Sequence, residues 1–169
     1  MALKFHSIEP EQITDNTFKL IGSDWMLITA GKIKSYNMMT ASWGGFGVLW
    51  HKHVCWCVIR PQRHTYTLME KSNYFTLSFF HEEHRNLLQF FGSHSGKHVN
   101  KMGQAGITPR ETDHQNIYFD EARLVIECKK IYFQDITPAN FLDPKTAENY
   151  PNKDYHRMYV GEIISCLIK

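Results

Sequence analysis

Short hydrophobic runs, rather than long amphipathic segments, dominate the pattern along this chain. The runs are rich in β-branched, aromatic and sulfur-containing residues, and Gly, Pro, Asn or Asp flank them, as is typical of β-strands. The pattern predicts strands at residues 25–30, 54–59, 74–80, 122–133 and 159–168. The last two segments are long enough to cross a barrel.

Helical periodicity is scarcer. Residues 82–91 give the best helical segment, because Leu87, Leu88 and Phe91 share a face and Gly92 follows as a stop signal. Shorter helical turns are expected at residues 66–71, 138–142 and 144–149. Strands without regular strand–helix–strand alternation favour a mainly β fold, an antiparallel barrel with helices packed outside, over a parallel α/β architecture.

Composition narrows the class of protein. The chain has 169 residues, 43% hydrophobic and 14% aromatic, which suits one globular domain over residues 1–169. A net charge of +2 without a basic stripe argues against nucleic acid, and no run approaches a membrane span. Four cysteines without a C-x-x-C pair or a secretory signal predict reduced thiols and a cytoplasmic location.

Residues 37–45 combine hydroxyl side chains, a tryptophan and two glycines. Small residues let backbone amides approach a ligand closely, and hydroxyls hydrogen-bond ligand oxygens. The alternative is a Gly-rich hairpin around a core tryptophan. The binding candidates in this run are Met39, Thr40, Ala41, Ser42 and Trp43.

Two arginines follow the apolar run at residues 54–59. Arg60 and Arg63 offer planar sets of donors that suit a phosphate group. Thr65 could cap a short helix that continues through Tyr66, and a helix N-terminus attracts anions. The alternative is a solvated turn whose arginines bind nothing.

Residues 92–97 form a second candidate phosphate loop. The run offers the hydroxyls of Ser93 and Ser95, the free backbone of Gly96 and the cation of Lys97. It is not a Walker A loop, because only three residues separate its glycines and a histidine follows the lysine. No G-x-G-x-x-G run occurs either, so the sequence predicts no dedicated dinucleotide-binding domain.

Histidines and cysteines alternate at His51, His53, Cys55 and Cys57. On one strand these side chains would share a face, and such nitrogen and sulfur ligands suit zinc. Four ligands in a straight row span too far to close one tetrahedron, so we predict no metal site. His156, near the start of the last strand, is either a polar group at a reactive site or a buried structural histidine.

Taken in chain order, these segments resemble the flavin reductase-like, flavoredoxin-type proteins. The order of several motifs is more specific than any one of them, and the resemblance spans roughly residues 15–169. The segments that carry it are residues 39–44, 60–66, 74–80, 92–96, 135–136, 140–144 and 154–162.

The resemblance implies a six-stranded antiparallel Greek-key split β-barrel that binds FMN and forms a homodimer. Residues 40–43 would lie along the flavin ring and ribityl chain, the arginines and residues 93–96 would bind the phosphate, and His156 would lie near the ring edge as the catalytic candidate. The whole FMN-binding set expected is Met39, Thr40, Ala41, Ser42, Trp43, Arg60, Arg63, Thr65, Tyr66, Ser93, Ser95, Gly96 and Lys101.

Three functions stay open on these grounds. The first is an NAD(P)H-dependent flavin reductase that passes electrons to a small-molecule or protein acceptor; the cofactor carries the chemistry, so no catalytic dyad is needed. The second is a flavoredoxin-type electron-transfer protein without NAD(P)H activity. The third is a metal- or haem-binding protein that uses the His/Cys run.

Overall fold

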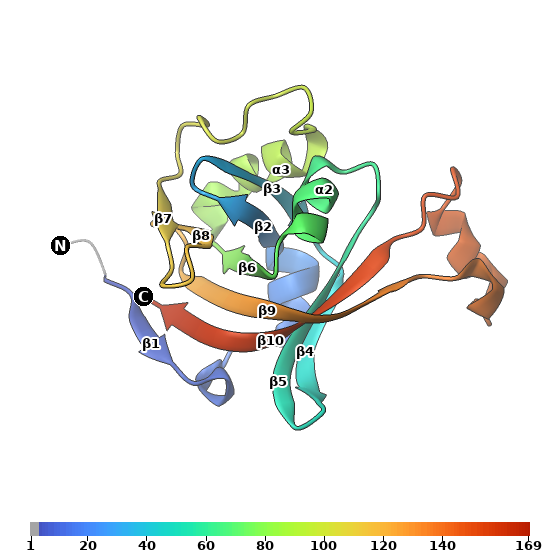
Figure 1. Ribbon diagram of the computed structural model, residues 1–169, viewed down its shortest axis with the longest axis horizontal. Coiled ribbons are helices and arrows are strands. Elements are labelled where there is room, and N and C mark those ends of the chain that lie inside the picture. The colour runs from blue at the N-terminus through green and yellow to red at the C-terminus, as the bar shows by residue number, and fades with distance from the viewer. Residues whose placement is uncertain (1–3) are drawn as a thin grey trace.

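One strongly curved antiparallel sheet forms the body of the molecule (Figure 1). The computed structural model describes residues 4–169. Eight strands pair in the order β3-β2-β6-β9-β10-β5-β4, with β1 on β10, and β7 and β8 form a separate hairpin. The strands are β1 (His6–Ile8), β2 (Met26–Lys32), β3 (Ser35–Ala41), β4 (Gly44–Leu49), β5 (Lys52–Ile59), β6 (Tyr74–Phe79), β7 (Pro109–Glu111), β8 (Ile117–Phe119), β9 (Leu124–Asp135) and β10 (Arg157–Ile168).

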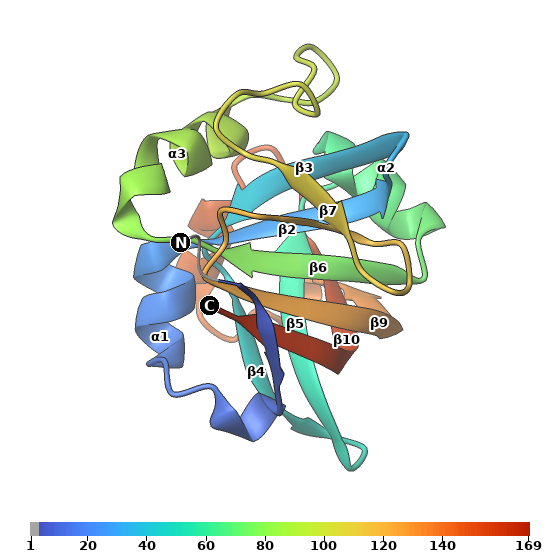
Figure 2. The ribbon, with the colours of Figure 1, turned by 90° about the vertical axis from the view of Figure 1, so that its left-hand side faces the viewer.

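Short helices lie outside the sheet. Both α2 and α3 pack against β3, at one edge of the strand order, and Figure 2 shows α1 and α3 on the same side of the molecule. The α-helices are α1 (Thr17–Lys19), α2 (His64–Lys71) and α3 (Arg85–Ser93). Shorter 3-10 or π-helical turns occupy Pro10–Gln12, Leu20–Asp24, Glu82–His84, Pro138–Asn140 and Pro144–Asn149. No helix within residues 4–169 has the length and apolar character needed to cross a bilayer.

The mainly β fold with peripheral helices is confirmed, but the expected strand count of six is wrong. The sheet has eight strands because β1, β3 and β4 join the strands that hydrophobic runs predicted. β3 reads as a mixed polar and apolar loop, and β4 begins with two glycines, so neither shows a strand pattern. Gly92 does not stop the helix: α3 runs on to Ser93, whose Oγ donates to the carbonyl of Gln89 at 2.9 Å.

A glycine at the centre of β10 lets two cysteines meet across it. Cys55 on β5 and Cys128 on β9 are buried free thiols whose sulfur atoms lie 3.0 Å apart. β10 lies between these two strands, and Gly161 stands opposite Cys55 without a side chain to separate them. A Cβ at Gly161 would lie 2.7 Å from the Cβ of Cys128 and from the ring of Phe75.

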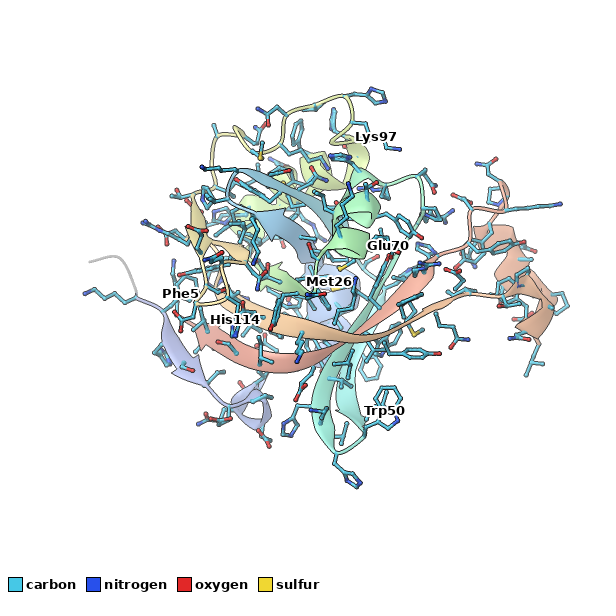
Figure 3. All side chains as sticks on the ribbon, viewed as in Figure 1. Phe5, Met26, Trp50, Glu70, Lys97 and His114 are labelled. Carbon is cyan, nitrogen blue, oxygen red and sulfur yellow. The ribbon has the colours of Figure 1, made fainter. Side chains whose placement is uncertain are left out.

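Apolar side chains reach solvent at the β4–β5 hairpin. Val48 is 72% exposed and Trp50 is 57% exposed, and Figure 3 shows Trp50 beside the β4–β5 hairpin. Its ring lies 5.9 Å from that of Tyr132 on β9. The expected homodimer stays a prediction.

Replacing Gly161 by alanine should destabilise the barrel by about 1–3 kcal/mol, because the added methyl group overpacks a filled core. Urea unfolding of the purified variant measures this loss. Gly47→Ala on β4 is the matched control: nothing lies within 4 Å of the added atom, so its stability should change by no more than about 0.5 kcal/mol. Equal stabilities of the two variants would contradict this account of the core.

Candidate functional site

The residues that the sequence singled out gather where the two edges of the sheet meet. β3 and β4 lie at opposite ends of the strand order, and Ser42 and Trp43 link them directly. The run at residues 37–45 is therefore not a simple hairpin loop. It is the end of one edge strand, a link of two residues and the start of the other edge strand.

Two hollows flank the end of β3, and Thr40, Ala41 and Ser42 line both of them. The smaller, of about 210 Å³, is completed by Met39, Trp43, Val58, Arg60 and His156. The larger, of about 390 Å³, is completed by Trp25, Leu88, Gln89, Gly92 and Ser93. The structure thus brings together most of the sequence-predicted set around one strand end.

His156 is a buried neutral histidine at the wall of the smaller hollow. Its Nδ1 lies 3.0 Å from the hydroxyl of Tyr150, and its ring centroid lies 5.1 Å from that of Trp43. Burial, together with the positive charge of Arg60, lowers the pKa of His156 to about 4. At neutral pH the side chain therefore offers a hydrogen-bonding group without charge.

Arg60 lines the same hollow, but its charge is already balanced. Its Nη1 donates to Asp154 at 2.6 Å and its Nη2 to the carbonyl of Asn149 at 2.8 Å, while the guanidinium covers the ring of Tyr150. The hydrogen bond from Arg60 lowers the pKa of Asp154 below its usual value. Arg60 is thus held as part of an ion pair beside His156.

Arg63 and Lys101 form a different arrangement, at the carboxyl end of α3. Arg63 donates to the carbonyls of Gly92 at 2.8 Å and Phe91 at 3.3 Å. Lys101 is 2% exposed and donates to the same Phe91 carbonyl at 2.8 Å and to that of Met38 at 3.0 Å. Neither cation forms an ion pair with a carboxylate anywhere in residues 4–169.

Burial affects the pKa values of both cations, and the charge of Arg63 also affects that of Lys101. Burial lowers the pKa of Arg63, and burial followed by the charge of Arg63 lowers the pKa of Lys101 to about 8. The carbonyl end of a helix supplies only about half a negative charge. A net positive charge therefore remains beside Gly92, which lines the larger hollow.

Thr65 and Gly96 both lie against Asn37 on β3. Thr65 is fully buried and accepts a hydrogen bond from Asn37 Nδ2 at 2.8 Å. The expectation that it caps α2 is wrong, because Arg63 is the N-cap residue and Thr65 lies inside the helix. A side chain at Gly96 would overlap Asn37, so only glycine lets its loop pack this closely on β3.

Ser93, Ser95 and Tyr66 each contact other groups of the protein. Ser93 Oγ lies 3.0 Å from His94 Nδ1 in addition to its helical bond, and Ser95 Oγ accepts from the backbone of Lys97 at 3.2 Å. Tyr66 lines neither hollow; its ring packs edge-on against Tyr159. Lys97 lies on the exposed loop after α3 (Figure 3).

The side chains of the alternating His/Cys run do not come together at one point. His51 lies in the turn before β5, His53 is exposed and pairs with Glu11 at 2.9 Å, and Cys55 and Cys57 are buried in the barrel core. Within residues 4–169, no three histidine, cysteine or carboxylate side chains are grouped as a metal site would require.

Trp25, Val58, Leu88 and Gln89 also line the two hollows, although nothing in the sequence pattern marks them as binding residues. The hydrophobic pattern marks Val58 and Leu88 only as core positions of a strand and a helix, and it marks Trp25 as the first residue of a strand. Only the tertiary fold shows that Trp25 borders a cavity.

Comparison with known proteins places the chain in a single group. The family model described as "Flavin reductase like domain" matches residues 18–169. No curated protein sequence matches the chain.

Several solved structures share the fold. The FMN-binding domain of a flavin reductase-like enzyme from Shewanella baltica has a TM-score of 0.72 at 18% identity, over 99% of this chain and 78% of its own. The FMN-binding protein of Thermus thermophilus gives 0.68 at 20% identity, over 97% and 82% of the two chains. Flavoredoxin of Desulfovibrio vulgaris gives 0.67 at 19% identity, over 96% and 77%.

The buried state of His156 predicts a pH-dependent stability. In the unfolded chain this side chain binds a proton as the pH falls below 6.5, whereas in the folded chain it binds the proton only near pH 4. Stability is therefore undisturbed above pH 6.5, and the free energy of unfolding falls by up to about 3 kcal/mol as the pH drops towards 4. Urea unfolding at pH 7 and pH 4.5 measures the fall. His156→Gln should show a smaller fall, and identical pH dependences in the two proteins would contradict the prediction.

Proposed function

Because this chain belongs to the flavin reductase-like family, we propose that it is a flavoprotein that binds FMN across the end of β3. The observation that carries the proposal is the pair of cations Arg63 and Lys101, which has no carboxylate partner within residues 4–169. Arg63 binds the carbonyl of Gly92, which lines the hollow formed by hydroxyl and small residues. The names of the similar structures support it, since two of those compared are FMN-binding proteins.

The phosphate is assigned to the Arg63–Lys101 side of the site. A phosphate monoester carries close to two negative charges near neutral pH, which would balance the two cations. Gly92 and Ser93 line the adjacent hollow, so a phosphate there would meet the end of α3 where the positive charge is concentrated. Arg60 is the weaker phosphate candidate, because Asp154 already neutralises it.

The flavin ring and ribityl chain are assigned to the bed formed by Thr40, Ala41 and Ser42. These residues offer short side chains and a strand end whose outer edge pairs with no other strand in residues 4–169. Arg60 and the neutral His156 would lie at one margin of this bed. Bound FMN would supply hydride acceptance and electron transfer.

The chain's own residues then have positioning and electrostatic roles. Arg63 and Lys101 hold the anionic end, the bed at residues 40–42 orients the ring, and Arg60, held in its ion pair with Asp154, lies at the margin of the bed. His156 supplies a hydrogen-bonding group that stays uncharged at neutral pH. No side chain in this arrangement needs to act as an acid, a base or a nucleophile.

The first test compares two lysines on the same segment. Lys101→Met should weaken FMN binding by roughly 10- to 100-fold, the loss expected for one charge-assisted contact of about 1.5–3 kcal/mol. Lys97→Met is the matched control, because this lysine is exposed and should change the affinity by less than about 3-fold. Titration calorimetry with FMN measures both. Equal affinities of the two variants would show that Lys101 does not bind the phosphate.

The second test separates the two flavin functions. We propose that the protein is an NAD(P)H-dependent reductase, because a second hollow of about 210 Å³ adjoins the bed and the compared NADH:FAD oxidoreductase of Streptomyces globisporus shares the fold, with a TM-score of 0.65 at 13% identity. Anaerobic mixing of the FMN-loaded protein with NADH, and separately with NADPH, should bleach the flavin absorbance within minutes. If neither nucleotide bleaches a flavin that dithionite reduces, the protein is an electron-transfer module instead.

A further inference from the structure

Trp25 is held in a backbone conformation that side chains rarely adopt. Its φ of 72° and ψ of 155° fall in a region that is nearly restricted to glycine. The residue ends the π-helical turn Leu20–Asp24 and immediately precedes β2. Such conformations persist only where the surroundings enforce them, and they gather at binding sites.

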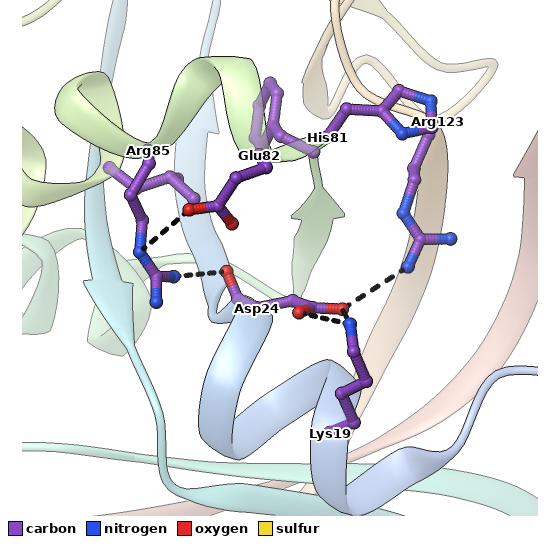
Figure 4. Close-up of a pocket in the computed structure, with 8 residues that line it drawn as sticks. Lys19, Asp24, His81, Glu82, Arg85 and Arg123 are labelled. Carbon is purple, nitrogen blue, oxygen red and sulfur yellow. Dashed lines mark hydrogen bonds and ion pairs between the residues drawn. The ribbon is translucent and has the colours of Figure 1, made fainter.

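A network of cations around Asp24 enforces this conformation (Figure 4). The guanidinium of Arg85 lies 3.5 Å above the indole of Trp25, and its Nη1 donates to the carbonyl of Asp24 at 3.2 Å. The carboxylate of Asp24 accepts from Lys19 at 2.7 Å and lies 3.8 Å from Arg123. The residue before Trp25 and the indole itself are therefore both anchored.

The anchored indole of Trp25 forms part of the wall of the larger hollow. Trp25 lines the larger hollow together with Thr40, Ala41 and Ser42. Arg85 lines the neighbouring cavity of about 300 Å³ and not this hollow, and Leu88 lines both, so the guanidinium over the indole belongs to a separate cavity. Gly92, whose carbonyl binds Arg63, lines the same hollow as Trp25. A ligand held there by a phosphate at one end would meet an indole at the other.

We propose that Trp25 is a flavin-contacting residue whose indole stacks on the isoalloxazine ring in the larger hollow, and that Arg85 and Asp24 position it. The proposal rests on the proposed function, since it requires bound FMN. Aromatic rings stack favourably with an offset, and a cation over one indole face leaves the ring side that borders the hollow for a ligand. Arg85 acts through Trp25 and is a positioning residue.

Flavin fluorescence tests the contact directly, because an indole stacked on an isoalloxazine quenches its emission by electron transfer. Wild-type protein saturated with FMN should show strongly quenched flavin emission. Saturated Trp25→Leu should recover much of the emission and bind FMN about 10-fold more weakly. Arg85→Met should give a partial recovery, which a purely structural role of Arg85 would not produce in a folded protein.

Phe18→Leu is the matched control, since Phe18 is an aromatic residue 91% exposed on α1 that lines neither hollow. It should retain wild-type affinity and quenching. If Trp25→Leu does not fold, Trp25→Gly replaces it, because glycine accepts this backbone conformation without strain.

The outcomes separate the two claims. Wild-type quenching and affinity in an FMN-loaded Trp25 variant would overturn the stacking proposal alone and leave the proposed function intact. Failure of the wild-type protein to take up FMN at micromolar concentrations would overturn the proposed function and this inference with it.

Discussion

Two positive charges at the carbonyl end of α3, with no carboxylate paired to them in the described part of the chain, form the constraint on which the site depends. Lys101 is buried and Arg63 is partly buried, and both are held by backbone carbonyls rather than by an anion. Burying charge in this way is costly unless it is balanced. The lowered pKa of Lys101 records that cost. A bound phosphate would convert the costly arrangement into a charge-assisted one, which is the role we propose for this end of α3.

The barrel positions a strand end next to these two cations. Two edge strands, β3 and β4, meet through a link of only two residues, which places a strand end with free backbone beside the cations. Close packing makes the link possible: a side chain at Gly44 or Gly45 would collide with Trp56 on the neighbouring strand. The conformational freedom of this short segment is therefore removed before any ligand arrives, and a preorganised bed binds with a smaller entropic cost.

The local pattern of hydrophobic residues predicts much of the fold, but it does not predict which groups each site residue contacts. Apolar strands such as β5 and β6 carry their own signal. The mixed composition of β3 hides a strand that only its pairing with β2 stabilises. The sequence predicts phosphate binding for both Arg60 and Arg63, because each offers the same planar set of donors, yet Arg60 forms an ion pair with Asp154, 94 residues further along the chain. Such a long-range pair has no local signature, and neither does the burial of Lys101.

The most direct measurement compares FMN with riboflavin, which has the same ring and ribityl chain but no phosphate. If the uncompensated cations select the phosphate, wild-type protein should bind FMN at least about 100-fold more tightly than riboflavin, a difference of about 3 kcal/mol. Equal affinities for the two flavins would contradict the account, because the positive charge at the end of α3 would then have no role in binding.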